Sequence, residues 1–114
     1  MDTLHLDNEV NQLILEGKND EAFMKYYDEH VVAQENDEPE RHGREQWRAA
    51  RAEMDKNIER ADVKLLANAA NEDVSFSEWD MTIEMKWMGT MRIQQVAVRR
   101  WKDGRIVRER FYHK

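Results

Sequence analysis

The sequence predicts an α+β fold in which helices cover one face of a curved sheet. Two observations lead to this prediction. Up to about residue 60, most apolar side chains recur at helical spacing. Beyond that point, four runs rich in β-branched and aromatic residues are separated by short turns, which is typical of an antiparallel meander. The predicted order is helix, helix, short strand, long helix and four-strand antiparallel meander, in one domain spanning residues 1–114.

The first two helices are predicted from the residues at their ends. Asp7 can cap the first helix, because its carboxylate can accept hydrogen bonds from first-turn amides, and Gly17 suits the position just past its end. Leu4 and Leu6 either extend this helix or pack before it. A second, short helix is capped by Asn19 or Asp20. A short strand follows over residues 30–35, and then an acidic loop that holds the only proline.

The longest predicted helix covers residues 43–60. Charged residues fill most of its surface, and one apolar stripe remains to face the core. The stripe consists of Trp47, Ala50, Met54, Ile58 and Ala61. A strand over residues 62–70 follows, and a three-residue turn over 71–73 leads into the next strand.

Two turns set the register predicted for the last three strands. Asp103-Gly104 suits a type I′ turn and places Val98 opposite Glu109, while Gly89 suits a type II′ turn one hairpin earlier. Because side chains alternate along a strand, these turns assign each residue to a face. The predicted core face carries Val63, Leu65, Ala67, Ala69, Trp79, Met81, Ile83, Met85, Trp87, Arg92, Gln94, Val96, Val98, Arg100, Val107, Glu109, Phe111 and His113. The predicted outer face carries Ala97, Arg99, Trp101, Ile106, Arg108, Arg110 and Tyr112.

Composition excludes several classes of protein. A hydrophobic content of 40% with 37% charged residues fits a globular rather than a disordered chain. The absence of cysteine excludes disulfide scaffolds, thiolate metal sites and thiol nucleophiles. The histidines lack metal-binding spacing and no glycine-rich phosphate loop is present, so we expect neither a metal nor a cofactor. No apolar run has membrane-spanning length and the acidic start lacks a signal-peptide pattern, so we expect a cytoplasmic protein without a membrane partner.

Charge is distributed unevenly along the chain. Residues 1–40 hold 2 basic and 12 acidic side chains, whereas residues 89–114 hold 8 basic and 2 acidic ones. The basic strands could bind nucleic acid through Arg99, Arg108 and Arg110, but the acidic first part would oppose a phosphate backbone. We therefore expect the acidic and basic layers to offset each other within one fold, with no nucleic-acid partner.

Three segments resemble the SnoaL-like branch of the nuclear transport factor 2-like superfamily. They read NDEAFMKYYDEHVV over residues 19–32, HGREQWRA over 42–49 and VAVRRWKDGRIVRERFYHK over 96–114. The resemblance extends over nearly the whole chain. It implies a cone in which a strongly curved mixed or antiparallel sheet wraps around the long helix and encloses an apolar pocket. Relatives include polyketide cyclases, ketosteroid isomerases, dehydratases and epoxide hydrolases, and members often pair through the outer sheet face.

The sequence departs from the cyclases at the last strand. There the cyclases carry an acid/base aspartate, often within a Tyr-Tyr-Asp-like triplet, whereas this chain reads Phe111-Tyr112-His113. The resemblance thus places His113 where the carboxylate stands. The connection between the third and fourth strands is a tight turn here, which implies a smaller or more open pocket mouth. The Tyr/Asp arrangement of the ketosteroid isomerases has no match at corresponding positions.

His113 and Glu109 are the candidate catalytic residues, because both are predicted on the core face. An imidazole titrates near neutral pH and could move a proton at a carbon next to a carbonyl, with Gln94 opposite to orient it. Glu109 in an apolar wall could act as a base. The alternatives are that His113, beside the terminal residue, is solvated, and that Glu109 forms an ion pair with Arg100.

An aromatic and methionine-rich wall suits a flat hydrophobic ligand, and it equally suits an ordinary core. The candidate ligand-binding residues are Tyr26, Tyr27, Trp47, Trp79, Met81, Trp87, Gln94 and Phe111.

Two functional hypotheses follow. The first is a cofactor-free pocket protein that binds a small apolar or carbonyl-containing molecule, with acid/base isomerisation, cyclisation or dehydration as its chemistry. The alternative is a non-enzymatic homodimeric binding or interaction module on the same fold. The homodimer is predicted because Trp101, Ile106 and Tyr112 are assigned to the outer sheet face.

Overall fold

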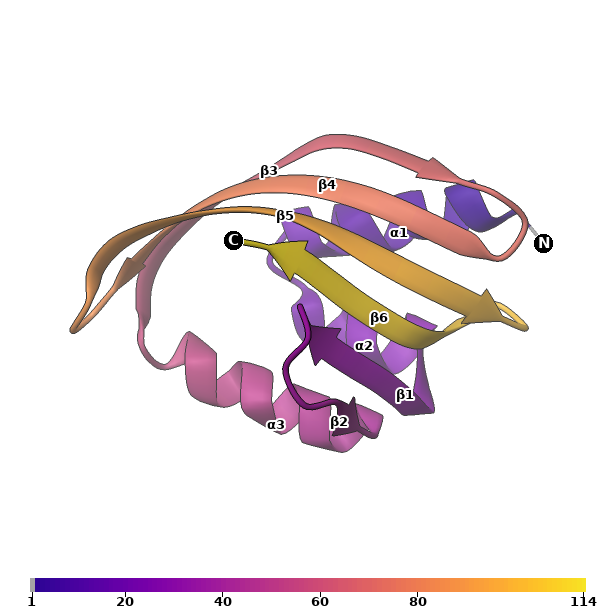
Figure 1. The fold of residues 1–114 in the computed structure, drawn as a ribbon, viewed down its shortest axis with the longest axis horizontal. Coiled ribbons are helices and arrows are strands. Elements are labelled where there is room, and N and C mark those ends of the chain that lie inside the picture. The colour runs from indigo at the N-terminus through magenta and orange to yellow at the C-terminus, as the bar shows by residue number, and fades with distance from the viewer. Residues whose placement is uncertain (1) are drawn as a thin grey trace.

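The computed structural model describes residues 2–114 (Figure 1). The described helices are α1 (Thr3–Leu15), α2 (Asn19–Tyr26) and α3 (Arg44–Asp55). The described strands are β1 (Tyr27–Glu35), β2 (Arg41–His42), β3 (Ile58–Ala70), β4 (Val74–Met85), β5 (Gly89–Lys102) and β6 (Arg105–His113).

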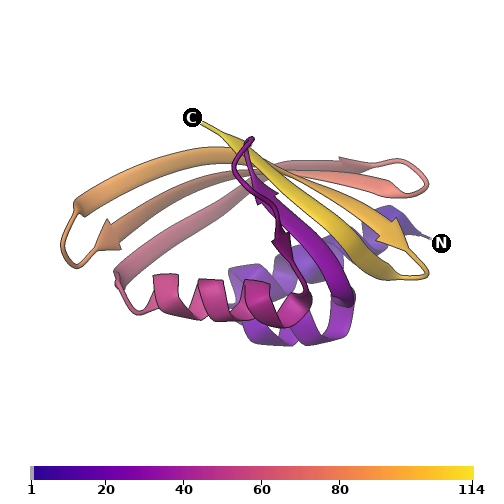
Figure 2. The same cartoon turned by 60° about the horizontal axis from the view of Figure 1, so that its bottom comes forward.

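All the described strands form one mixed sheet in the order β2-β1-β6-β5-β4-β3. β1 runs parallel to β6, whereas every other neighbouring pair is antiparallel. Figures 1 and 2 show the sheet arching over the helices, which all lie on its concave side. The α+β fold and the antiparallel meander of β3 to β6 are therefore confirmed, and the sheet is open rather than closed.

α1 begins earlier than predicted. Asp2 caps the helix, since its carboxylate accepts a hydrogen bond from the His5 amide at 3.1 Å. Asp7 is therefore not a cap but lies inside the helix, fully buried. The end of the helix is as predicted: Gly17 follows it with a φ of +76°, a conformation that glycine adopts without strain.

α3 is shorter than predicted and ends at Asp55. Ile58 and Ala61, expected on its apolar stripe, belong instead to β3. The change of structure follows a turn at Lys56 and Asn57, and β3 then pairs with β4 from Ile58 onward. The strand predicted at residues 30–35 also begins earlier, at Tyr27, directly after α2.

A β-bulge between β5 and β6 alters the predicted register. The Asp103-Gly104 turn is present with positive φ at both residues, as a type I′ turn requires. Trp101 pairs with Ile106, but Arg100 then pairs with Arg108, so Val107 is an extra residue. Beyond it, each residue of β6 faces a partner one position away from the predicted one.

The bulge reverses the predicted faces of β5. Ala97, Arg99 and Trp101 are buried towards the helices, whereas Val96 and Val98 are only half-buried. The prediction that placed the first three on the outer face is wrong. It could not have been corrected from hydrophobicity alone, because β-branched or aromatic side chains occupy both faces of this strand.

The β4–β5 hairpin also turns at a different place. Met85 pairs with Gly89, so the turn consists of residues 86–88 rather than Gly89 and Thr90. The amide of Lys86 donates to the carbonyl of Asn57 at 2.8 Å and anchors this turn to the start of β3. Trp87, predicted on the core face, lies in the turn and is 87% exposed.

A bulge at Leu66 of β3 changes which side chains face α1. The three-residue turn at 71–73 is confirmed, but Leu66 is an extra residue between Leu65 and Ala67. Consequently Ala67 and Ala69 are exposed, and Asn68 contacts α1 in their place.

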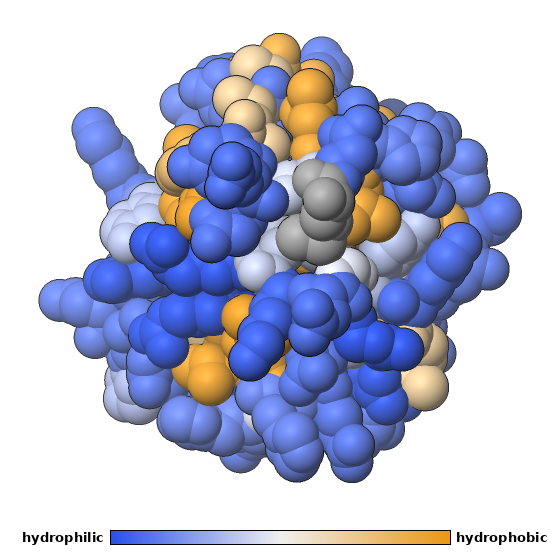
Figure 3. Space-filling model, turned by 90° about the vertical axis from the view of Figure 1, so that its right-hand side faces the viewer, coloured by the Kyte–Doolittle hydropathy of each residue, from blue (hydrophilic) through white to orange (hydrophobic). Residues whose placement is uncertain are grey.

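The outer face of the sheet also differs from the prediction, because residues expected there are buried. Ile106 and Trp101 belong to the core, and of the three residues that suggested a dimer only Tyr112 is exposed. Arg99 is likewise absent from the surface proposed for nucleic acid. At the end of the molecule where α1 begins, the surface is mostly hydrophilic, with small apolar groups between (Figure 3). No helix among residues 2–114 has the length and apolar character needed to cross a membrane.

Candidate functional site

A cavity of about 540 Å³ lies between the helices and the concave face of the sheet. Elements far apart in sequence contribute to its wall: α1, α2, α3, β1, β3, β4, β5 and β6. Most of the wall is apolar, and its aromatic and large aliphatic members include Phe23, Trp47, Trp79, Met81, Ile83 and Phe111. The volume falls in the range of small-molecule sites, roughly 300–1,000 Å³.

The charged lining residues, together with Tyr27, form two groups that differ in burial. Asp55 and Asp62 are exposed and Arg51 is half-buried, with Arg51 Nε 3.2 Å from Asp55 Oδ1. Tyr27, Arg99 and Glu109 are buried, at 4%, 1% and 1% exposure. The first group therefore lies where the cavity meets solvent, and the second at its closed side.

The buried group is held by short hydrogen bonds centred on Glu109. Tyr27 Oη donates to both carboxylate oxygens, at 2.7 Å and 2.8 Å, and Arg99 Nε donates to Oε2 at 2.7 Å. Burial and the neighbouring Glu109 charge raise the pKa of Tyr27 well above 10, so its hydroxyl stays protonated. An ion pair was one alternative considered for Glu109. It exists, but with Arg99 rather than Arg100.

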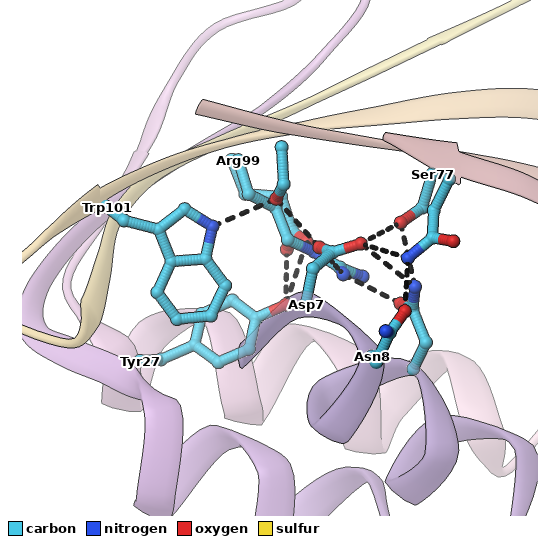
Figure 4. Close-up of polar contacts among 10 residues, drawn as sticks. Asp7, Asn8, Tyr27, Ser77, Arg99 and Trp101 are labelled. Carbon is cyan, nitrogen blue, oxygen red and sulfur yellow. Dashed lines mark hydrogen bonds and ion pairs between the residues drawn. The ribbon is translucent and has the colours of Figure 1, made fainter. Parts of the chain in front are cut away.

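Behind this group, Arg99 connects Glu109 to a second buried carboxylate, Asp7 of α1. Figure 4 shows Arg99 and Asp7 close together between the sheet and the helix. Arg99 Nη1 donates to Asp7 Oδ1 at 2.8 Å and to Asn11 Oδ1 at 2.7 Å. Arg99 Nη2 has no hydrogen-bond partner among the described residues. Burial disfavours the charged guanidinium, but the charges around it outweigh burial and raise the pKa of Arg99, so it is a permanent cation.

Asp7 accepts hydrogen bonds on both oxygens. Ser75 and Arg99 donate to Oδ1, and the donors to Oδ2 are the side chains of Asn11, Asn68 and Ser77. Burial acts to raise the pKa of Asp7, but the Arg99 charge and these hydrogen bonds together lower it below 3.8. Asp7 is therefore a buried anion that ties α1 to β4 and β5.

The sequence contains two signals for this network. Asp7 and Asn11 are four residues apart and share one face of α1, which also carries the buried Val10. Ser75 and Ser77 alternate with Trp79 on the buried face of β4. A small polar pair in each of two buried faces indicates that a polar partner lies between them. The partner, Arg99, was missed because of the bulge at Val107.

The structure brings six of the predicted site residues to the cavity: Tyr27, Trp47, Trp79, Met81, Glu109 and Phe111. Tyr26 is buried elsewhere, with its hydroxyl donating to Glu9 at 2.7 Å and its ring 6.5 Å from that of Trp101. Gln94 is exposed, and the next residue, Gln95, lines the cavity instead.

His113 does not line the cavity. Its Nε2 lies 2.7 Å from Glu35 Oε2 at the end of β1, and Nδ1 lies 3.0 Å from the carbonyl oxygen of Lys114. Both contacts favour the imidazolium, the backbone contact most strongly, and raise the pKa of His113 above 6.5. The two candidate catalytic residues are therefore not brought together.

Within residues 2–114, Trp47 Nε1 is the one side-chain nitrogen or oxygen atom that is itself shielded from solvent and lacks a hydrogen-bond partner. The Trp47 ring packs edge-on against that of Phe23, with 6.1 Å between the ring centroids, and its centroid lies 5.9 Å from that of Phe111. Within the same residues, no group of three or more His, Asp or Glu side chains is arranged to hold a metal ion.

The sequence matches the family model described as a SnoaL-like domain over residues 10–109. No match was found among curated proteins. The solved structures with the same fold include a protein named as a SnoaL-like polyketide cyclase from Mesorhizobium loti, with 23% identity, a TM-score of 0.85 and coverage of 98% of this chain and 99% of that one.

Two further neighbours have less specific names. An NTF2-like protein of unknown function from Burkholderia pseudomallei shares 12% identity, with a TM-score of 0.83 over 97% of this chain and 89% of that one. A protein with a ketosteroid isomerase-like fold from Catenulispora acidiphila, in complex with trimethylamine, shares 18% identity, with a TM-score of 0.73 over 88% of this chain and 78% of that one. At these identities the likeness concerns the fold alone.

Proposed function

Because the chain belongs to the SnoaL-like domain family, we propose that it binds a small, predominantly apolar molecule in the cavity, with one polar group of that molecule at Tyr27, Arg99 and Glu109. The observation that carries this proposal is the composition of the cavity wall. A largely apolar surface with a few convergent polar groups at its closed side is the usual construction of a small-molecule site. The trimethylamine bound by the Catenulispora acidiphila protein supports small-molecule binding on this fold.

The cluster at the closed side gives such a ligand a fixed polar surface. Tyr27 and Arg99 hold the Glu109 carboxylate in one position, and Asp7 in turn holds Arg99. Side chains that are fixed before binding lose little conformational entropy when a ligand arrives. The apolar wall supplies affinity, and the cluster orients the bound molecule.

A pair of matched variants tests whether the cavity is the binding site. Ala61 and Ala67 are both exposed alanines on β3, but only Ala61 lines the cavity. With the neutral dye Nile red as the probe, we expect fluorescence enhancement and saturable binding for the wild type and for Ala67→Trp. Ala61→Trp places an indole in the cavity and should abolish binding. Equal binding by both variants would place the dye elsewhere and contradict the proposal.

A second candidate function is cofactor-free acid/base chemistry on a bound carbonyl compound, such as isomerisation, cyclisation or dehydration. It is favoured by Glu109, which lines the cavity and whose Oε1, among the described residues, accepts a hydrogen bond from Tyr27 alone. A carboxylate in that position can take a proton from a carbon next to a carbonyl. We expect the protein to catalyse deuterium exchange of a planar cyclic ketone in D₂O. Glu109→Gln should stop the exchange while Nile red still binds, and exchange at an undiminished rate would refute this function.

A further inference from the structure

We propose that the cavity selects its ligand by charge, and that it binds an apolar molecule carrying a protonated amine in preference to the same molecule carrying a carboxylate. The proposal rests on the proposed function, because it concerns the ligand class of the same cavity. Three features of the site lead to it: the charge balance of the buried cluster, the unused acceptor capacity of Glu109 and the aromatic wall.

The buried cluster contains two carboxylates and one cation. Asp7, Arg99 and Glu109 are each at most 1% exposed, and Arg99 contacts both of the others. With both carboxylates ionised, the cluster carries one net negative charge. Because water has little access to these groups, that charge is screened much less than it would be at the surface.

Glu109 is the carboxylate of the cluster that a ligand can reach. Asp7 already accepts five hydrogen bonds, and it does not line the cavity. Within residues 2–114, Glu109 Oε2 accepts from Tyr27 and Arg99, whereas Oε1 accepts from Tyr27 alone. Since a carboxylate oxygen accommodates about two hydrogen bonds, Oε1 can accept one more from an ammonium group.

The rest of the wall suits a cation as well. Five aromatic side chains line the cavity, and the electron-rich face of an aromatic ring attracts an ammonium group. They are Phe23, Tyr27, Trp47, Trp79 and Phe111. The rings of Phe23 and Tyr27 lie 4.8 Å apart, which brings aromatic surface next to the Glu109 cluster.

Arg99 is the group that would favour an anion instead. Its Nη2 has no partner among the described residues, so a ligand carboxylate could receive a hydrogen bond there. That carboxylate would be the third on one guanidinium, in a region with little water to screen the repulsion between anions. At the solvent end, Arg51 is already paired with Asp55, and the nearby Asp62 adds another negative charge to the lining. The charges of the lining residues therefore disfavour an anion at both ends of the cavity.

Three probes on one skeleton test the proposal: 2-naphthylmethylamine, 2-naphthylmethanol and 2-naphthoic acid. Each is competed against Nile red on the intact protein at pH 7, where the amine is protonated and the acid ionised. We expect the amine to bind at least about ten-fold more tightly than the acid, with the alcohol between them. The ratio should persist in high salt, because the buried cluster is poorly screened, whereas an effect of the exposed Asp55 and Asp62 would decline.

Two matched variants assign the effect to Glu109. Glu109→Gln keeps the size of the side chain and an oxygen facing Tyr27, but it makes the cluster neutral and should reduce the amine-to-acid ratio about ten-fold. Glu59→Gln is the same change at an exposed position of β3 outside the cavity, and should leave the ratio unchanged. Circular dichroism checks the fold of each. The wild-type ratio in high salt is read without any variant, so it decides the proposal even if Glu109→Gln does not fold.

The possible failures are distinguishable. An acid that binds the wild type as tightly as the amine, while Nile red binds and is displaced, overturns the charge selection and leaves the proposed function standing. An amine preference that survives in Glu109→Gln or disappears in high salt also overturns it, because the buried cluster is then not its source. If neither the dye nor any probe binds, the proposed function fails, and this inference fails with it.

Discussion

Arg99 Nε lies 2.7 Å from Glu109 Oε2, and the two residues stand directly opposite each other on β5 and β6. The same guanidinium reaches Asp7 of α1 at 2.8 Å. One side chain therefore connects two strands, a helix and the closed side of the cavity. Paired buried charges do not by themselves add stability, but removing one partner leaves the other uncompensated.

Replacing Arg99 with methionine should therefore strongly lower the free energy of unfolding. Asp7 and Glu109 would remain as two buried carboxylates without their cation, and we expect a loss of about 3–5 kcal/mol, measured by urea unfolding. Arg92→Met is the control, because Arg92 pairs with Asp80 on the surface, and it should unfold at nearly the same urea concentration as the wild type. Similar losses for the two variants would show that burial of the Arg99 pairs has no energetic consequence.

Asp7 should make the protein sensitive to acid. Its pKa is lower in the folded state than the ordinary 3.8, since burial, which raises it, is outweighed by Arg99 and by the hydrogen bonds to the carboxylate. A lowered pKa means that the stabilisation is complete above pH 3.8 and is lost as the pH falls through the folded-state value. Asp7→Asn should cost about 3 kcal/mol or more at neutral pH. Its stability should also decline less steeply than that of the wild type below pH 3.8, and parallel declines would contradict this account.

Arg99 and Asp7 also show how far the sequence predicts the structure. The order of the elements, the Asp103-Gly104 turn and the inward position of Glu109 all follow from local rules for turns and alternation. Arg99 is predicted on the outer face because the extra residue Val107 is not foreseen; it shifts the β5–β6 pairing by one position, so that Glu109 stands opposite Arg99 rather than Val98. No local pattern marks that bulge, since the alternatives bury similar numbers of apolar side chains.

Asp7 was missed for a different reason. Ser, Thr, Asn and Asp near the start of a helix are usually caps, and Asp2 and Asp7 have the same chemistry. Only the tertiary partners of Asp7 distinguish them: Arg99, Ser75 and Ser77 are all more than 60 positions away in the sequence. The apolar half of the site, from Trp47, Trp79, Met81 and Phe111, could be predicted because it depends on periodicity within single elements.

The tyrosines of the core should resist ionisation. Burial and then Glu9 raise the pKa of Tyr26 to about 12, while burial and Glu109 raise that of Tyr27 well above 10. In an alkaline titration followed by ultraviolet absorbance, neither should ionise near pH 10 while the protein is folded. The stabilisation from a raised pKa is complete below pH 10 and is lost as the pH rises through the folded-state value. Tyr26→Phe and Tyr27→Phe identify each signal, and ionisation of either tyrosine near pH 10 in the folded protein would refute the assignment.

Two tryptophans that the sequence placed on one face should behave differently. Trp79 is 3% exposed and lines the cavity, so Trp79→Ala should cost about 3–5 kcal/mol in urea unfolding. Trp87 is 87% exposed in the β4–β5 turn, so Trp87→Ala should change the stability by no more than about 0.5 kcal/mol. A large loss of stability in Trp87→Ala would mean that Trp87 is buried in solution by contact with another molecule.

His113 should be independent of ligand binding. It contacts Glu35 and the Lys114 carbonyl, and it lies outside the cavity wall. Its pKa is raised, so its stabilising contribution is complete below pH 6.5 and is lost as the pH rises through the folded-state value. His113→Ala should therefore lower the thermal midpoint more in mildly acidic than in alkaline buffer, while Nile red affinity stays at the wild-type value. Imidazole resonances in an NMR titration report the pKa directly. Weakened dye binding in His113→Ala would return this residue to the candidate site, from which its position in the fold now excludes it.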